Sequence, residues 1–251
     1  MIKFFRRIRQ RLLSESKFSK YLIYAIGEII LVVIGILIAL QINTWNEERK
    51  DSQTASILAE SLIADLNKDR DFIKNAIQLG EQKIVACDRL IHYVKIFEDL
   101  EDLTELYGSL NIVSQSHPFF PTDGTYQQVV TSGTLMLFDQ ELANQLNGYS
   151  MQLKKCEYWA NVEDEALWKL ADLVFADINL QVLMDLRLQL DEKNEMFFNL
   201  SAQDRPEFIN LVAYVQTVRT LTLNEYREQL KVAEKLINEL SDSYINSDTD
   251  R

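Results

Sequence analysis

A run of twenty-two apolar residues, 21–42, constrains the fold of this chain more than any other feature. It reads YLIYAIGEIILVVIGILIALQI and carries a single charge, at Glu28. A helix needs about 20 apolar residues to cross a bilayer, because each residue adds about 1.5 Å to its length. The run is too long for an ordinary core helix, and the small-x-small cleavage site of a signal peptide does not follow it. We therefore expect 21–42 to be an uncleaved transmembrane helix.

The segments on either side of this helix predict its orientation. Residues 1–20 hold seven basic side chains and one acid, so their formal charge is +6. Under the positive-inside rule this segment stays in the cytoplasm. The whole chain carries −12, and removing the +6 and the −1 of Glu28 leaves −17 for residues 47–251. We expect a single-pass protein whose acidic domain lies outside the cytoplasm.

The basic segment also carries apolar residues, among them Phe5 and Leu12, at helical spacing between its arginines. This pattern predicts an amphipathic helix on the anionic inner leaflet. The alternative is that the basic residues act only as a topology signal. Binding to nucleic acid is not expected, since the rest of the chain is acidic and the sequence pI is about 4.7.

The first 48 residues, MIKFFRRIRQRLLSESKFSKYLIYAIGEIILVVIGILIALQINTWNEE, resemble the N-terminus of an uncharacterised family of small single-pass membrane proteins of Bacteroidota. A weaker similarity covers TYQQVVTSGTLMLFDQELANQLNGYS at 125–150. Because that family is uncharacterised, the resemblance implies lineage and topology rather than chemistry. It implies an anchor in the bacterial inner membrane and a periplasmic domain.

The composition of the outer domain favours helices. The chain has 7 glycines and 3 prolines, which is few for the many turns of an all-β fold. Apolar residues recur in alternating steps of three and four over 73–94, 142–174 and 223–244. Such seams pack together in antiparallel bundles and coiled coils. We predict an all-α protein, with one transmembrane helix followed by an antiparallel helical bundle.

We expect the chain to be organised in successive parts. These are a basic amphipathic cytoplasmic segment (1–20), the transmembrane helix (21–42), a juxtamembrane connector (43–56), a helical periplasmic domain (57–245) and a flexible tail (246–251). The connector contains neither glycine nor proline. It therefore permits a continuous helix from about 17 to 97, and a hinge at the membrane surface is the alternative.

Local signals mark several helix ends. Gly133 is expected to end a short helix that begins near Asp123, and Asp139 is expected to cap the next helix. Asp204, followed by Pro206 in the first turn, is expected to begin the last long helix.

Two segments are expected to lie outside the helices. The run LMDLRLQLDE at 183–192 alternates apolar and polar residues, so we expect it to be extended. The polar tail from Ser241 is expected to fray.

Glu28 is the one candidate functional residue inside the membrane. A charged carboxylate near the bilayer centre costs about 2.5–3.5 kcal/mol, so it is a candidate proton carrier, ion ligand or partner for a basic residue of another subunit. The alternatives are that it is protonated and hydrogen-bonded, or that it reaches the interface. Gly35 and Ala39 share its helix face and form a small-xxx-small pair, which permits close packing with another helix.

The two cysteines and two histidines give weaker predictions. Cys87 and Cys156 lie on two apolar seams. They form one disulfide in an oxidising periplasm, or they stay buried as free thiols. His92 and His117 are far apart and lack the ligand spacing of a zinc site.

Aromatic and acidic clusters are expected to be structural. We expect the aromatic residues to lie in the core rather than in a ligand cage: Phe119, Phe120, Tyr126, Trp159 and Trp168. Acidic runs such as 163–165 are expected to be solvated helix faces.

Motifs of catalysis are absent from the sequence: it contains no phosphate-binding glycine loop, no GxSxG, no HExxH and no CxxC. We therefore expect neither an enzyme nor a cofactor or metal site. The first hypothesis is a membrane-anchored scaffold for protein–protein interaction, with the lipid bilayer and a protein partner or second copy as its contacts. The alternatives are a ligand-sensing subunit that signals through a partner, and a subunit of an ion-coupled complex that uses Glu28.

Overall fold

The computed structural model describes residues 18–117, 120–190 and 194–246. It divides into two compact units, Met1–Thr54 and Ala55–Arg251. The amphipathic helix predicted near the N-terminus and most of the predicted flexible tail lie outside the described residues.

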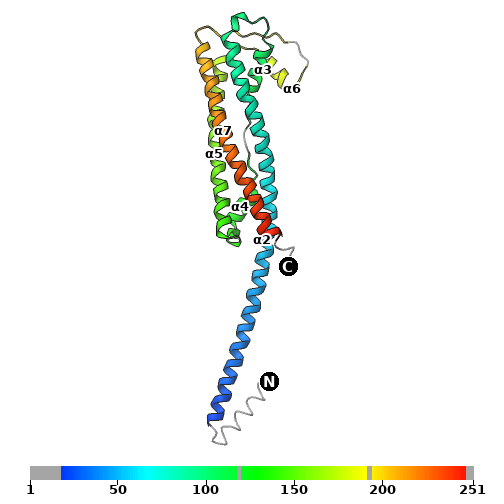
Figure 1. The fold of residues 1–251 in the computed structure, drawn as a ribbon, viewed down its shortest axis with the longest axis vertical. Coiled ribbons are helices and arrows are strands. Elements are labelled where there is room, and N and C mark those ends of the chain that lie inside the picture. The colour runs from blue at the N-terminus through cyan, green and yellow to red at the C-terminus, as the bar shows by residue number, and fades with distance from the viewer. Residues whose placement is uncertain (1–17, 118–119, 191–193, 247–251) are drawn as a thin grey trace. The chain divides into compact units, whose positions relative to one another are not determined.

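Most of the described residues are helical (Figure 1). In chain order the elements are α2 (Phe18–Lys95), η1 (Phe97–Asp99), α3 (Thr104–Val113), α4 (Gly124–Thr131), η2 (Thr134–Leu137), α5 (Gln140–Val174), α6 (Leu180–Leu188), α7 (Arg205–Leu240) and η3 (Ser241–Ile245). One isolated antiparallel bridge joins Ile178 and Phe198. The all-α prediction is confirmed for the described part of the chain.

The first unit contains the N-terminal part of α2. The apolar side chains of this part are exposed, and an 18-residue window reaches a mean hydropathy of 2.7. Among the described residues this is the one helix long and apolar enough to span a membrane. Helical structure continues through residues 43–56, which agrees with the continuous-helix alternative.

The second unit is built on three long helices, residues 55–95 of α2 together with α5 and α7 (Figure 1). α2 and α5 run in the same direction with a constant register. Tyr149 bonds to Asp69 and Glu163 bonds to Lys83, and each pair is separated by 80 residues. This differs from the antiparallel order that the sequence predicts, because the segment 96–139 returns along the helices before α5 begins.

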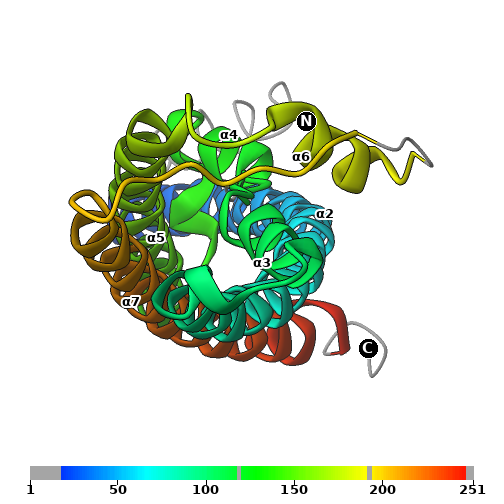
Figure 2. The same cartoon turned by 90° about the horizontal axis from the view of Figure 1, so that it is seen from above.

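α7 runs opposite to α2. Arg227 forms an ion pair with Glu81, while Glu234, two turns later in α7, pairs with Lys74, earlier in α2. Viewed along the helices, α5 and α7 are neighbours (Figure 2). The three helices therefore enclose a common interior.

Two apolar clusters fill that interior. The first is formed mainly by α2, α5 and α7 and contains Leu62, Leu66, Ile73, Leu146, Leu153, Cys156, Tyr226 and Leu236. The second adds α3 and α6 and contains Cys87, Leu90, Leu106, Leu170, Leu183, Phe208 and Val212. Along α2, α5 and α7 the buried charged residues between the two clusters are Lys83, Glu163 and Arg219.

Residues 183–188 are helical, so the prediction that 183–192 is extended is wrong where the structure describes it. The Asn179 side chain accepts a hydrogen bond from the amide of Gln181 at 3.0 Å and caps α6. Leu183 is buried in the second apolar cluster. The helix ends at Leu188, and the next residue, Gln189, has a left-handed φ of 55°. Capping and tertiary burial thus override the alternating pattern.

The predicted helix ends agree with the structure in most cases. Asp139 caps α5 by accepting the amide of Leu142 at 2.8 Å. Gly133, with a φ of 75°, follows α4. Pro206 lies in the first turn of α7, although the carboxylate of Asp204 accepts a bond from Ser201 rather than capping the helix.

The prediction that the chain frays from Ser241 onward is wrong as far as Ile245. Residues 241–245 form a π-helical turn, and the Tyr244 ring meets the Phe138 ring edge-on at 5.1 Å. The Tyr244 hydroxyl also accepts a hydrogen bond from the amide of Asp139 at 3.0 Å. These contacts fix the end of α7 against the start of α5.

Candidate functional site

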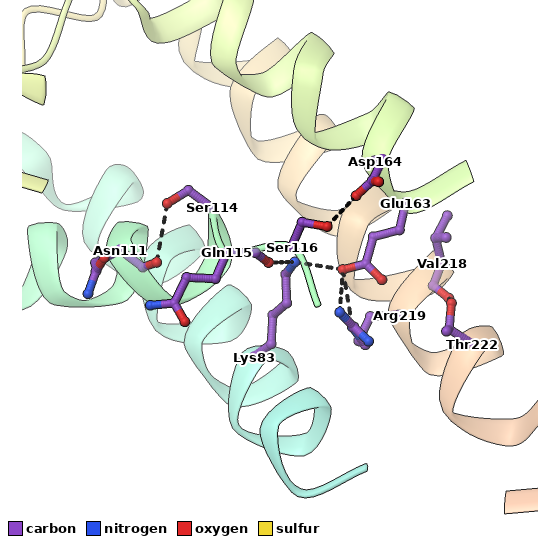
Figure 3. A network of polar contacts seen from close by, with 10 residues as sticks. All are labelled: Lys83, Asn111, Ser114, Gln115, Ser116, Glu163, Asp164, Val218, Arg219 and Thr222. Carbon is purple, nitrogen blue, oxygen red and sulfur yellow. Dashed lines mark hydrogen bonds and ion pairs between the residues drawn. The ribbon is translucent and has the colours of Figure 1, made fainter. Parts of the chain in front are cut away.

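Lys83, Glu163 and Arg219 form a buried charged layer between the two apolar clusters. Their exposed fractions are 1 %, 3 % and 2 %. Lys83 Nζ lies 2.6 Å from Glu163 Oε1, and Arg219 Nη2 lies 2.9 Å from the same oxygen. Figure 3 shows both cationic side chains pointing at this one atom from two different helices.

Two cations share one carboxylate in this layer. Burial lowers the pKa of Lys83, and Arg219 adds to the effect, whereas Glu163 opposes it. Lys83 also donates a hydrogen bond of 2.7 Å to the backbone carbonyl of Gln115. The ammonium group is thus held by a carboxylate and a carbonyl in place of water.

The loop after α3 is held at Gln115 and again at the next residue, Ser116. Ser116 Oγ donates a hydrogen bond of 2.6 Å to Oδ1 of Asp164, beside Glu163 on α5 (Figure 3). His117 is half-buried next to the layer. Burial, together with Arg219 and Lys83, lowers the pKa of His117.

The charged layer suits a structural role. Its three side chains are almost fully enclosed, so a ligand cannot reach them without displacing core residues. A buried charged group tolerates only the partner that neutralises it, which favours one register of the three helices. The sequence pattern already placed Glu163 on an apolar seam, but the prediction that 163–165 is solvated is wrong for Glu163. Lys83 was missed, although its spacing from Ile73, Ala76 and Leu90 places it on the same helix face.

A pocket of about 320 Å³ opens beside this layer. Its lining is mainly apolar and comes from α3, α5, α6 and the adjoining loops: Leu110, Ser114, Ser116, Asp164, Leu167, Trp168, Leu170, Ala171, Val174, Phe175, Ile178, Leu180 and Leu183. Small-molecule pockets measure about 300–1,000 Å³ and are mostly apolar with a few polar groups. The size and lining of this pocket match that description.

Trp168 lines the pocket and is 72 % exposed, so the prediction that it lies in the core is wrong. Phe120 is 76 % exposed and departs from the same prediction. Tyr126 and Trp159 are half-buried, and Phe119 lies outside the described residues. An amphipathic seam predicts which helix face is buried, but Trp168 lies one residue beyond the seam position Leu167 and turns outward.

Cys87 and Cys156 are both buried free thiols in different apolar clusters. Burial raises the pKa of each thiol to about 12. The register of α2 and α5 places Cys156 level with Ala76, which is eleven residues, or about 16 Å, from Cys87 along the helix. A disulfide needs Cα atoms within about 7 Å. The free-thiol alternative is therefore the one the structure contains.

The other sequence-predicted residues are not brought together. Glu28, Gly35 and Ala39 belong to the first unit, and the space that a Cβ of Gly35 would fill is open. Among the described residues there is no group of three or more side chains arranged to hold a metal ion. The His92 ring lies beside that of its neighbour Tyr93, with centroids 5.7 Å apart and the ring planes tilted at 58°.

A comparison with protein families finds a match over residues 28–173, to a family described as "Family of unknown function (DUF6090)". The matched range is more than half of the chain and contains Lys83, Glu163, Asp164 and Trp168. No curated protein and no solved structure matches the chain.

Proposed function

The chain belongs to this family of unknown function, DUF6090, and from that premise we propose that it is a membrane-anchored protein whose helical domain binds a small ligand. The pocket between α3, α5 and α6 carries the proposal. It combines about 320 Å³ of largely apolar space with the polar side chains of Ser114, Ser116 and Asp164 at its edge. Such a combination is the usual form of a small-molecule site.

We place the domain in the periplasm of a Gram-negative envelope. The +6 charge of residues 1–20 favours a cytoplasmic N-terminus and a span at 21–42. The resemblance to single-pass proteins of Bacteroidota supports the inner membrane as the location. Labelling of introduced cysteines by an impermeant maleimide in whole cells tests this orientation: residue 105 should react and residue 16 should not.

Ligand binding at this pocket would act through a partner. In this proposal the ligand-bound state of the helical domain is recognised by a protein partner, which carries the signal onward. This is the ligand-sensing alternative that the sequence leaves open.

Thermal unfolding of the full chain in lipid nanodiscs tests ligand binding. A ligand at a hundred times its Kd stabilises the folded state by about 2.7 kcal/mol. We expect a fraction of periplasmic metabolites to raise the Tm of the wild type. Ala171→Phe, which fills the pocket from α5, should abolish that rise. A rise that persists in Ala171→Phe, or no rise with any fraction, would contradict the proposal.

Protein–protein interaction or scaffolding is the second candidate, favoured by an exposed apolar surface at the same end of the domain. We call it the α5–α6 surface, and its exposed members are Trp168, Phe175, Leu180, Met184, Leu186, Leu188 and Leu190. Patches of this kind often mark interaction sites. A constant partner lost on Met184→Ser, at an exposed α6 residue of this surface outside the pocket lining, but kept on Met151→Ser, at an exposed α5 residue outside the surface, would favour this candidate over ligand binding.

An ion-coupled role for Glu28 stays a prediction from its position in the sequence. Glu28→Gln should abolish function under this hypothesis and leave a scaffold or ligand-binding protein nearly unchanged. Gly35 and Ala39 would then mark the helix face that meets another subunit or a second copy. Disulfide cross-linking of Gly35→Cys in membranes tests that contact.

A further inference from the structure

The pocket contains one ionisable side chain among the described residues that line it, Asp164. We propose that the pocket takes a small amphiphilic cation, with an apolar body in the aliphatic cavity and an ammonium head against Asp164 and Trp168. This rests on the proposed ligand-binding function and names the chemical class of the ligand.

The cavity sets the size of the apolar body. An apolar cavity of about 150 Å³ holds one benzene ring, and this pocket is about 320 Å³. Its inner wall is aliphatic and includes Leu110, Leu170 and Leu183, all buried in the second apolar cluster. A two-ring aromatic group or a short branched chain therefore fits the available space.

Asp164 and Trp168 set the charge of the head group. The two residues lie four apart on α5, which places them on one helix face, about 6 Å apart along the axis. The Asp164 carboxylate is held in place by the 2.6 Å bond from Ser116. Trp168 is 72 % exposed and so offers its ring to a ligand. A carboxylate beside an accessible indole attracts an organic cation through charge and through the ring face.

Cationic side chains lie near the pocket, and they would favour an anionic ligand if they faced it. Lys83 and Arg219, however, are buried and both directed to Glu163 Oε1. Arg187 donates to Ser114 Oγ at 3.1 Å and is not part of the lining. Residues 47–251 carry −17 in total, which concentrates cations near the domain. A neutral ligand covering Asp164 would also remove water from the carboxylate without replacing it.

Titration calorimetry on the full chain in zwitterionic nanodiscs tests the proposal, with empty nanodiscs as the blank. The probes are naphthylethylammonium, naphthylethanol and naphthylacetate, which share one apolar body and differ in charge. We expect the ammonium probe to bind about tenfold more tightly than the alcohol, and the carboxylate probe to bind most weakly. Asp164→Asn, which keeps the size and the acceptor for Ser116, should remove this preference.

Two further variants separate the causes. Asp172→Asn changes the net charge equally, at an exposed α5 residue outside the lining, and should keep the preference. Ala171→Phe should weaken all three probes. The cation inference would be overturned if naphthylacetate bound as tightly as naphthylethylammonium or more tightly. It would also be overturned if the preference for the ammonium probe persisted in Asp164→Asn. Either result would leave the proposed function intact. If no probe binds, the cation inference fails. The proposed function fails with it only if metabolite fractions also give no stabilisation that depends on Ala171.

Discussion

Lys83 and Glu163 lie 80 residues apart in the sequence, and their charged groups meet at 2.6 Å inside the protein, where neither side chain is more than 4 % exposed. The pair joins α2 to α5 in parallel. Arg219 adds α7 by bonding to the same oxygen of Glu163. One carboxylate therefore defines the level at which all three long helices meet.

Replacing Glu163 by glutamine should destabilise the protein strongly. The substitution keeps the shape but leaves two buried cations without a counter-charge, and breaking a buried pair in this way costs about 3–5 kcal/mol. We expect the Tm of the full chain in nanodiscs to fall by about 6–20 °C. Glu165→Gln, the same change two residues away on the exposed face, should shift the Tm by less than about 2 °C. Equal shifts in both variants would contradict the structural role of the layer.

The charged layer shows which part of the candidate site could be predicted from the sequence. Hydrophobic period placed Glu163 on the buried seam of α5, yet its position in an acidic run favoured a solvated face. The two signals conflict within one sequence, and the conflict is resolved only when Lys83 and Arg219 approach from other helices. Such long-range neutralisation has no local signature, so the layer could not be predicted from spacing alone.

Acid should destabilise the protein through His117. Its pKa is lowered in the folded state by burial and by the nearby Arg219 and Lys83. Between the lowered pKa and the ordinary value of 6.5, the unfolded chain binds more protons than the folded one, so stability rises with pH. The Tm of the wild type should therefore fall as the pH is lowered from about 7 towards 5. His117→Gln should reduce that fall, whereas His92→Gln, at the exposed histidine, should retain it. An identical pH dependence in all three proteins would contradict the prediction.

Gly80 should be intolerant of a side chain. A Cβ at Gly80 would lie 2.5 Å from Cδ2 of Leu223, which is buried where α2 meets α7. Overpacking of this kind costs about 1–3 kcal/mol, and the better helix propensity of alanine returns up to about 1 kcal/mol. We expect Gly80→Ala to lower the Tm. Gly148→Ala, where the space for a Cβ is open, should raise it or leave it unchanged. Adding Leu223→Val should recover part of the loss, and simple additivity of the two changes would argue against the contact.

Helix positions were easier to predict than helix partners. The caps at Asp139 and the proline in the first turn of α7 depend on neighbours within a few residues, so the sequence contains their signals. The parallel course of α2 and α5 depends on where the segment 96–139 leads the chain. The pocket depends on the packing of α6 against α3 and α5, and its residue Trp168 lies just off the apolar seam. Neither feature has a local pattern from which it could be derived.

Removing the hydroxyl of Tyr149 should destabilise the part of the domain that contains the first apolar cluster. Its OH donates a 2.6 Å hydrogen bond to Oδ2 of Asp69, which is 2 % exposed. Burial and the Asp69 carboxylate raise the pKa of Tyr149, so the hydroxyl stays a donor at neutral pH. Tyr149→Phe leaves Asp69 with the amide of Thr122 as its remaining hydrogen-bond donor in the described residues.

A hydrogen bond to a charged group contributes about 1.5–3 kcal/mol, and we expect Tyr149→Phe to lower the free energy of unfolding by that amount. Tyr158→Phe, at an exposed tyrosine of the same helix, is the matched control and should change stability by less than about 0.5 kcal/mol. A double-mutant cycle with Asp69→Ala isolates the pair, because alanine has no acceptor for the Tyr149 hydroxyl and each variant therefore removes the same hydrogen bond. A coupling energy near zero would show that this bond does not hold α2 and α5 in register, and the constant separation of 80 residues would then depend on the Lys83–Glu163 pair and the apolar packing between the helices.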